Sequence, residues 1–189
     1  MNIKTQLQSA LAYCNTQLAS KGVTDTATSV VDVGDKISTI QQGGGTDYLE
    51  AYLKDQTTAY QNDNITSLSA IDLGAWTNLT SVTFRNATGA VSTSAFYGCR
   101  SLTFADLGNI TRFNGNAMKN SGITTLILRN TSQMVTISNV GPFGGTPMVN
   151  GSGGTIYVPS ALKSSYEEDA TWQLLTSATF KAIEGSPYE

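Results

Sequence analysis

One pattern of apolar residues occurs three times between residues 65 and 143 of this 189-residue chain, and a fourth copy begins before the pattern breaks. Successive copies start 23, 22 and about 24 residues apart, and the third copy lacks one residue before Ile123. A fixed period of this size indicates a repeat architecture, in which each unit stacks on the next because it cannot bury its own apolar residues alone. The shared positions are Ile65, Leu68, Leu73, Leu79, Val82 and Phe84, then Thr88, Val91, Phe96, Leu102, Ala105 and Leu107, then Ile110, Phe113, Met118, Ile123, Leu126 and Leu128, with Met134, Ile137 and Phe143 in the fourth.

The period lies within the ~20–29 residues of leucine-rich repeats and predicts a short solenoid. Each copy ends in a segment of the form L-x-x-V-x-F, which is typical of a short strand because alternate side chains lie on one face. The predicted inward side chains are Val82, Phe84, Ala105, Leu107, Leu126 and Leu128. The predicted outward side chains are Ser81, Thr83, Arg85, Phe104, Asp106, Thr125, Ile127 and Arg129.

A family resemblance rests on residues 94–103, Ser-Ala-Phe-Tyr-Gly-Cys-Arg-Ser-Leu-Thr, which resemble the AF-x-G/N-C-x-S-L core of BspA-like leucine-rich-repeat domains. Residues 79–84 and 123–128 resemble the strand of that repeat, and residues 155–160 with Tyr166, Trp172 and 181–184 resemble its closing segment. The resemblance covers about residues 58–184, although Leu73 and Met118 replace the usual Phe, and Trp76 and Ser121 stand near the position of Cys99. The family occurs in bacterial surface proteins and in bacteriophage virion proteins, so the resemblance implies display and binding.

Two helices are predicted before the repeats, over residues 2–21 and 27–40, because apolar residues recur there at three- and four-residue steps. Both apolar seams are short, so they need a partner: the two helices form a hairpin, several chains form a bundle, or both. Residues 1–45 also resemble the N-terminal segment of phage tail-appendage proteins, through Lys21-Gly-Val23 and the spacing of Val33, Ile37 and Ile40. The predicted oligomerisation or docking residues are Ile3, Leu7, Leu11, Leu18, Val30, Val33, Ile37 and Ile40.

The predicted fold class is an α+β repeat, a short leucine-rich-repeat solenoid with a small N-terminal helical module. Its predicted parts are a helical attachment and oligomerisation module (1–42), a glycine linker (43–46), an N-terminal cap (47–64), the solenoid (65–158) and a C-terminal cap with a tail (159–189). Glycine-rich stretches indicate turns or linkers. A solenoid needs caps, because each of its ends exposes an apolar cross-section.

Several kinds of chemistry are disfavoured by the composition. The chain has no histidine, which removes Ser-His-Asp and Cys-His catalysis and the commonest metal ligand. The carboxylates of residues 167–169 lie on a predicted cap helix, where a solvated face is expected. A net charge of −3 without any run of Lys or Arg argues against nucleic-acid binding. We therefore expect no catalytic residue, no cofactor, no metal and no nucleic-acid partner.

Phe104 and Ile127 are apolar residues on the predicted outward side of the strands, with Arg85, Asp106 and Arg129 nearby. An apolar patch framed by charge is typical of a binding face or a subunit interface. The alternative is a strand register shifted by one residue, which would bury both apolar side chains. These five residues are the candidate interface.

The function expected from these features is that of a non-enzymatic bacteriophage virion protein, a fibre or appendage on the tail, baseplate or head. Its expected partners are further copies of itself, with a trimer favoured, other virion proteins and a host-surface component. The residues at the N-terminus do not form a secretory signal and no segment is long enough to span a membrane, so we expect synthesis in the host cytoplasm and location in the virion. The alternative is a bacterial surface adhesin of the same repeat family.

Overall fold

The computed structural model describes residues 12, 16, 54 and 56–189. The chain divides into two compact units, Met1–Gln56 and Thr57–Glu189. In the first unit, Ala12 and Thr16 are helical, as the predicted helix requires, and the Thr16 Oγ1 hydroxyl donates to the Ala12 carbonyl over 3.0 Å. The predicted linker, residues 47–53 and 55 of the predicted N-terminal cap, and all eight predicted oligomerisation residues lie outside the described residues.

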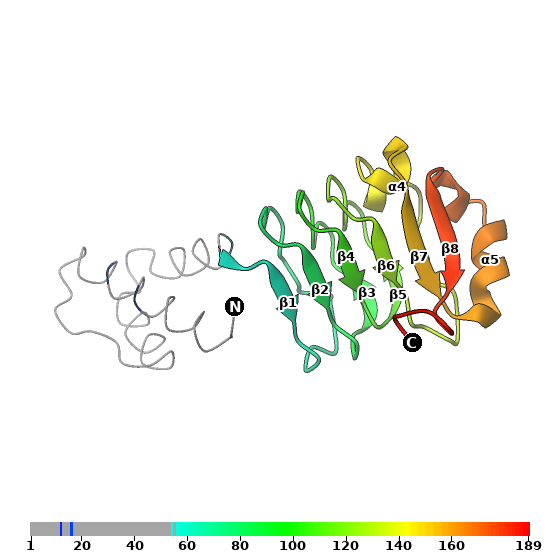
Figure 1. Ribbon diagram of the computed structural model, residues 1–189, viewed down its shortest axis with the longest axis horizontal. Coiled ribbons are helices and arrows are strands. Elements are labelled where there is room, and N and C mark those ends of the chain that lie inside the picture. The colour runs from blue at the N-terminus through cyan, green and yellow to red at the C-terminus, as the bar shows by residue number, and fades with distance from the viewer. Residues whose placement is uncertain (1–11, 13–15, 17–53, 55) are drawn as a thin grey trace. The chain divides into compact units, whose positions relative to one another are not determined.

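The second unit is a mixed α/β fold with mostly parallel strands and few helices (Figure 1). Six parallel strands form one sheet in the order β1-β2-β4-β6-β7-β8, and β3 and β5 form a second, two-stranded parallel sheet. The strands are β1 (Ala59–Gln61), β2 (Ser81–Thr83), β3 (Thr88–Val91), β4 (Phe104–Asp106), β5 (Asn109–Phe113), β6 (Thr125–Ile127), β7 (Gly154–Val158) and β8 (Ala178–Ala182). The helices are the 3-10 helices η1 (Gly141–Phe143), η2 (Ser160–Leu162) and η3 (Trp172–Leu174), and the α-helices α4 (Pro147–Asn150) and α5 (Lys163–Glu168).

Strands form at the three predicted places, and all six predicted inward side chains are buried. The repeat positions share one hydrophobic core, apart from Ile65 and Met134, which are half-buried and pack against it, and Thr88, which is exposed. Threonines just before the strands tie neighbouring copies together: the hydroxyls of Thr80, Thr103 and Thr124 each donate to a carbonyl 22, 23 or 21 residues earlier. The leucine-rich-repeat solenoid itself stays a prediction.

The fourth copy departs from the pattern, and the C-terminal cap compensates for the departure. Val135 is buried outside any named strand, yet its N–H donates to the Tyr166 hydroxyl over 2.6 Å, and its carbonyl accepts from Trp172 Nε1 over 2.8 Å. Tyr166 and Trp172 therefore provide the hydrogen bonds that a strand neighbour would otherwise supply. Trp172 and Leu175 are buried in this cap, and Phe180 belongs to β8, which has no counterpart among the predicted strands.

Burial raises the pKa of the Tyr166 hydroxyl to about 12 against an ordinary value of 10.0, although the hydrogen bond from the Val135 N–H partly offsets this. The folded state binds the proton of this hydroxyl more tightly than the unfolded state does. The contribution of the protonated hydroxyl to stability is therefore complete below about pH 10 and is lost as the pH rises towards 12. We expect this loss to reach about 3 kcal/mol, measured as the free energy of unfolding in urea across that range.

Replacing Tyr166 with Phe should remove this pH-dependent fall (the slope) in the free energy of unfolding. At neutral pH, the free energy of unfolding of the variant should be about 1–3 kcal/mol lower than that of the wild type, because the buried Val135 N–H loses its acceptor. Tyr97→Phe is the matched control, since the ring of Tyr97 is exposed and its hydroxyl lies outside the core. A Tyr166→Phe variant that keeps the wild-type slope would contradict this account.

Candidate functional site

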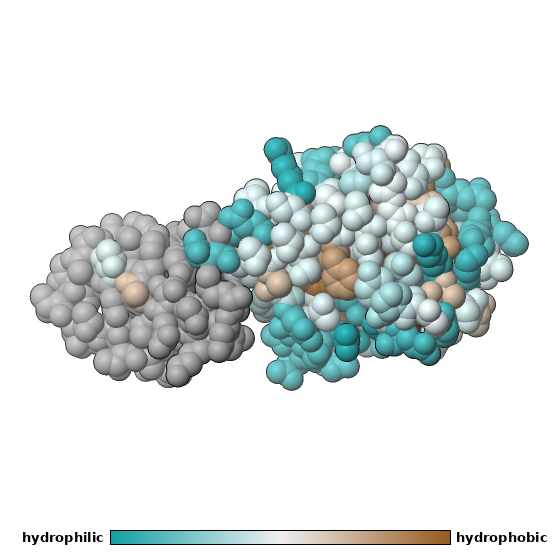
Figure 2. Space-filling view, viewed as in Figure 1, coloured by the Kyte–Doolittle hydropathy of each residue, from teal (hydrophilic) through white to brown (hydrophobic). Residues whose placement is uncertain are grey.

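Four neighbouring strands bring the predicted interface residues onto one face. The parallel register places Phe104 beside Thr125 and Asp106 beside Ile127, and β7 then places Tyr157 beside Ile127. We call this outward surface of β2, β4, β6 and β7 the sheet face. Figure 2 shows a hydrophobic patch on it over β4, and the outward apolar residue of that strand is Phe104, which is half-buried. The structure thus places Phe104, Asp106 and Ile127 on neighbouring strands of one face, and that this face is an interface stays a prediction.

The prediction that Ile127 and Asp106 are exposed is wrong. The relative exposure of Ile127 is 0% and that of Asp106 is 2%, although the strand register is the predicted one. The cause is the C-terminal tail, residues 185–189, which runs back from β8 towards β6 (Figure 1). The Tyr188 ring packs against Phe104 and Tyr157, with centroid separations of 5.6 and 4.7 Å. Burial of the sheet face therefore comes from the chain's own tail and not from a shifted register.

An ion pair between the buried Asp106 and the half-buried Arg129 fixes this tail. Arg129 Nε donates to Asp106 Oδ1 and Oδ2 over 3.0 and 3.1 Å, and Arg129 Nη2 donates to Asp106 Oδ2 over 2.8 Å. The same Nη2 also donates to the Tyr188 carbonyl over 2.8 Å. Arg85 lies further away, at 3.7 Å from Asp106, and its side chain is 62% exposed. Arg129 is thus the residue that joins the sheet to the tail, and Arg85 belongs to the exposed rim.

Removing the Tyr188 ring should uncover this face. We expect Tyr188→Ala to lower the free energy of unfolding by about 1–2 kcal/mol, because Phe104 and Ile127 regain contact with water and two ring contacts are lost. Binding of a fluorescent hydrophobic dye should rise in parallel. Pro187→Ala, at the exposed neighbouring position, is the control and should change neither measurement. Equal behaviour of the two variants would show that the tail does not cover the face in solution.

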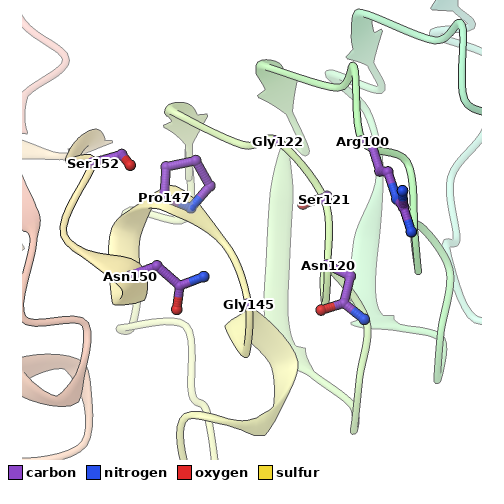
Figure 3. A pocket seen from close by; sticks show the side chains of 8 residues that line it. All are labelled: Arg100, Asn120, Ser121, Gly122, Gly145, Pro147, Asn150 and Ser152. Carbon is purple, nitrogen blue, oxygen red and sulfur yellow. The ribbon is translucent and has the colours of Figure 1, made fainter.

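A pocket lies on the turns at one end of the strands. Its volume is about 530 Å³, and we call it the turn pocket. Figure 3 shows Asn150 on α4 facing Asn120 and Ser121 across it, with Arg100 beyond them. The residues that line it are Arg100, Asn120, Ser121, Gly122, Gly145, Pro147, Asn150 and Ser152. Sequence patterns give no direct sign of this pocket, although the glycine-rich segment 150–154 marks the irregular loop on one side of it.

Two glycines bring the walls of the turn pocket together. A Cβ atom on Gly122 would lie 2.3 Å from the Arg100 carbonyl oxygen, so this turn approaches the previous one more closely than any side chain allows. Gly145 adopts φ +78°, and a Cβ there would lie 2.2 Å from Asn120 Oδ1. Asn120 itself has φ 59°, a left-handed conformation that Asn tolerates better than most residues. The pocket is therefore built by backbone geometry as much as by side chains.

The described residues contain no group of three or more Cys, Asp or Glu side chains placed to hold a metal ion. Within the same part of the chain, no helix has the length and apolar character needed to cross a membrane. Comparison with protein-family models, with curated proteins and with solved structures finds no match to this chain.

Proposed function

We propose that this protein is a non-enzymatic structural protein of a bacteriophage virion, a fibre or appendage on the tail, baseplate or head. Its leucine-rich-repeat domain presents a binding surface to the host cell, and its N-terminal helices attach and oligomerise it. The expected partners are further copies of the chain, in a trimer, and other virion proteins.

The observation that carries this proposal is the parallel register of the large sheet. Residues about 22 positions apart in the sequence lie side by side on one surface, so that Ser81, Phe104 and Thr125 form one row. Thr155 extends this row after a longer step of 30 residues. Such a surface is extended and rigid, and its outward residues can vary without disturbing the inward core. This geometry supports presentation of a surface. The sequence resemblance to virion proteins supports its place in a phage particle.

The low charge of the chain also supports display. Only 13% of its residues are charged, about half the usual share, and the threonine hydroxyls before the strands are engaged by neighbouring copies. A surface of this kind exerts little long-range electrostatic attraction, so its specificity must come from contact geometry. That property suits a protein that binds when it is brought to a cell surface by a larger particle.

The oligomeric state of the full chain tests this proposal. Size-exclusion chromatography with light scattering should give an oligomer, a trimer in the favoured case, for residues 1–189, and a monomer for residues 46–189, which contain the whole second compact unit. Ile37→Asp should dissociate the full-length oligomer, because a charge would then lie in the predicted seam. Ser38→Asp, one position further on, is the matched control. A monomeric full-length chain would contradict the proposal.

A further inference from the structure

The turn pocket contains a buried polar atom that the fold leaves without a partner. Ser121 is 3% exposed, and its Oγ atom makes no hydrogen bond within the described part of the chain. Figure 3 shows this side chain at the wall of the pocket that faces α4. An unpaired buried hydroxyl costs stability unless something in the pocket bonds to it. Ser121 also occupies the place where the preceding copy has Cys99, a buried residue whose Sγ donates to the Leu73 carbonyl over 3.0 Å.

The other polar groups of the pocket match a hydroxylated ligand. Asn120, Asn150 and Ser152 are exposed, and amides and hydroxyls both donate and accept hydrogen bonds, as sugar hydroxyls do. The side-chain amide of Asn120 donates to the Tyr97 hydroxyl over 3.4 Å, which holds an exposed aromatic ring beside the rim. Such a ring offers an apolar surface with a polar tip.

Arg100 is the charged residue among those that line the pocket, and none of the lining residues is acidic. A guanidinium group matches the two oxygens of a carboxylate through paired N–H donors. The pocket volume of about 530 Å³ lies within the ~300–1,000 Å³ range of small-molecule sites. Most such sites are apolar, however, and the lining here is amide, hydroxyl and guanidinium.

We infer that the turn pocket binds an acidic sugar, a residue of a polysaccharide that carries a ring carboxylate. Arg100 binds the carboxylate, and Asn120 and Asn150 bind ring hydroxyls from opposite walls. The Ser121 hydroxyl, once a rotation about its Cα–Cβ bond turns it from its buried position into the pocket, gains its missing partner from the sugar. This inference rests on the proposed function, since it names what the displayed domain would contact on a cell surface.

A carboxylate fits better than a phosphate at this place. A phosphate group carries nearly two negative charges at neutral pH and is usually held by several cations or by converging backbone N–H groups. One arginine with neutral amides and hydroxyls fits a single negative charge next to several hydroxyl groups. A hydrophobic ligand is disfavoured, because it would leave the Arg100, Asn120 and Ser121 polar groups without partners.

A matched pair of probes tests the inference. Methyl β-D-glucuronide and methyl β-D-glucoside differ only in a carboxylate against a hydroxymethyl group. Titrated into the ¹⁵N-labelled full chain, the glucuronide should shift the amide resonances of Asn120, Gly122 and Asn150, with a Kd of about 1 mM. The glucoside should bind at least about tenfold more weakly. Inorganic phosphate at the same ionic strength should produce no comparable shifts at these residues.

Two variants make the test specific to the pocket. Arg100→Gln should abolish the preference for the glucuronide, whereas Lys181→Gln, which removes the same charge from the exposed surface of β8, should leave it intact. Ser121→Ala should weaken glucuronide binding several-fold without lowering the midpoint of urea unfolding, because the hydroxyl has no partner in the fold. A purely structural Ser121 would instead lower that midpoint and leave binding unchanged.

Equal binding of the two sugars, shifts located elsewhere, or equal shifts with phosphate would each overturn the acidic-sugar site. These results are separable from failure of the proposed function. An oligomer that does not prefer the glucuronide would support the virion-appendage proposal and contradict the sugar site. A monomer that still prefers the glucuronide would support the sugar site and contradict the virion-appendage proposal.

Discussion

Arg129→Met should lower the free energy of unfolding by about 3 kcal/mol. The substitution leaves the buried Asp106 carboxylate with the exposed Arg85, 3.7 Å away, as its remaining charged partner. Removing one partner of a largely buried ion pair costs more than the pair itself contributes. The tail should detach at the same time, since the Tyr188 carbonyl loses its guanidinium donor. Urea unfolding measures the first effect, and the rate of carboxypeptidase removal of the last residues measures the second.

Two further variants distinguish the effect of breaking the Asp106–Arg129 ion pair from the effect of losing any arginine of this cluster. Arg85→Met removes the exposed member of the cluster and should cost less than about 1 kcal/mol, as exposed ion pairs usually do. The double variant Asp106→Leu with Arg129→Met should recover most of the lost stability, because replacing both charges by apolar side chains leaves no charge uncompensated. If Arg85→Met and Arg129→Met cost the same, burial of the Asp106–Arg129 pair is not what stabilises this face.

Phe143→Ala should lower the free energy of unfolding by about 3–5 kcal/mol, the range for removing a buried phenylalanine. Phe143 is fully buried, and its ring centroid lies 5.0 Å from that of Phe113 and 5.9 Å from that of Trp172. It therefore connects the last complete copy of the repeat to the C-terminal cap. Because Trp172 is part of this contact, its fluorescence should change in the folded variant as well as during unfolding.

Phe143→Leu is the conservative comparison and should cost clearly less, since most of the buried volume remains. Leu174→Ala is the surface control, because Leu174 is 46% exposed although it is also apolar and lies in the same cap. A cost below about 1 kcal/mol for Phe143→Ala would mean that the cap does not depend on this contact.

The two sites differ in how far they could be predicted. The sheet face could be located because period-two alternation and a regular repeat fix which side chains of β4 and β6 share a side. Its covering could not be foreseen, because Arg129 and the Tyr188 carbonyl are 59 residues apart and the tail has no periodic pattern. The turn pocket depends on Gly122, which approaches the Arg100 carbonyl, and on Gly145, which approaches the Asn120 side chain, and both contacts join residues that are more than 20 positions apart in the sequence.

The sequence by itself determined the inward pattern, because residues such as Val82, Ala105 and Leu126 repeat the same local environment copy after copy and each can be read from its neighbours. It also determined where the pattern ends, near Phe143. Only the tertiary structure decided that Ile127 and Asp106 are buried and that β8 extends the sheet. It also decided that Tyr166 and Trp172 form the hydrogen bonds of the Val135 backbone N–H and carbonyl. The physical reason is the distance along the sequence. The alternation of buried and exposed side chains depends on residues within one repeat, whereas these contacts join segments that are far apart in the sequence and that no local pattern brings together.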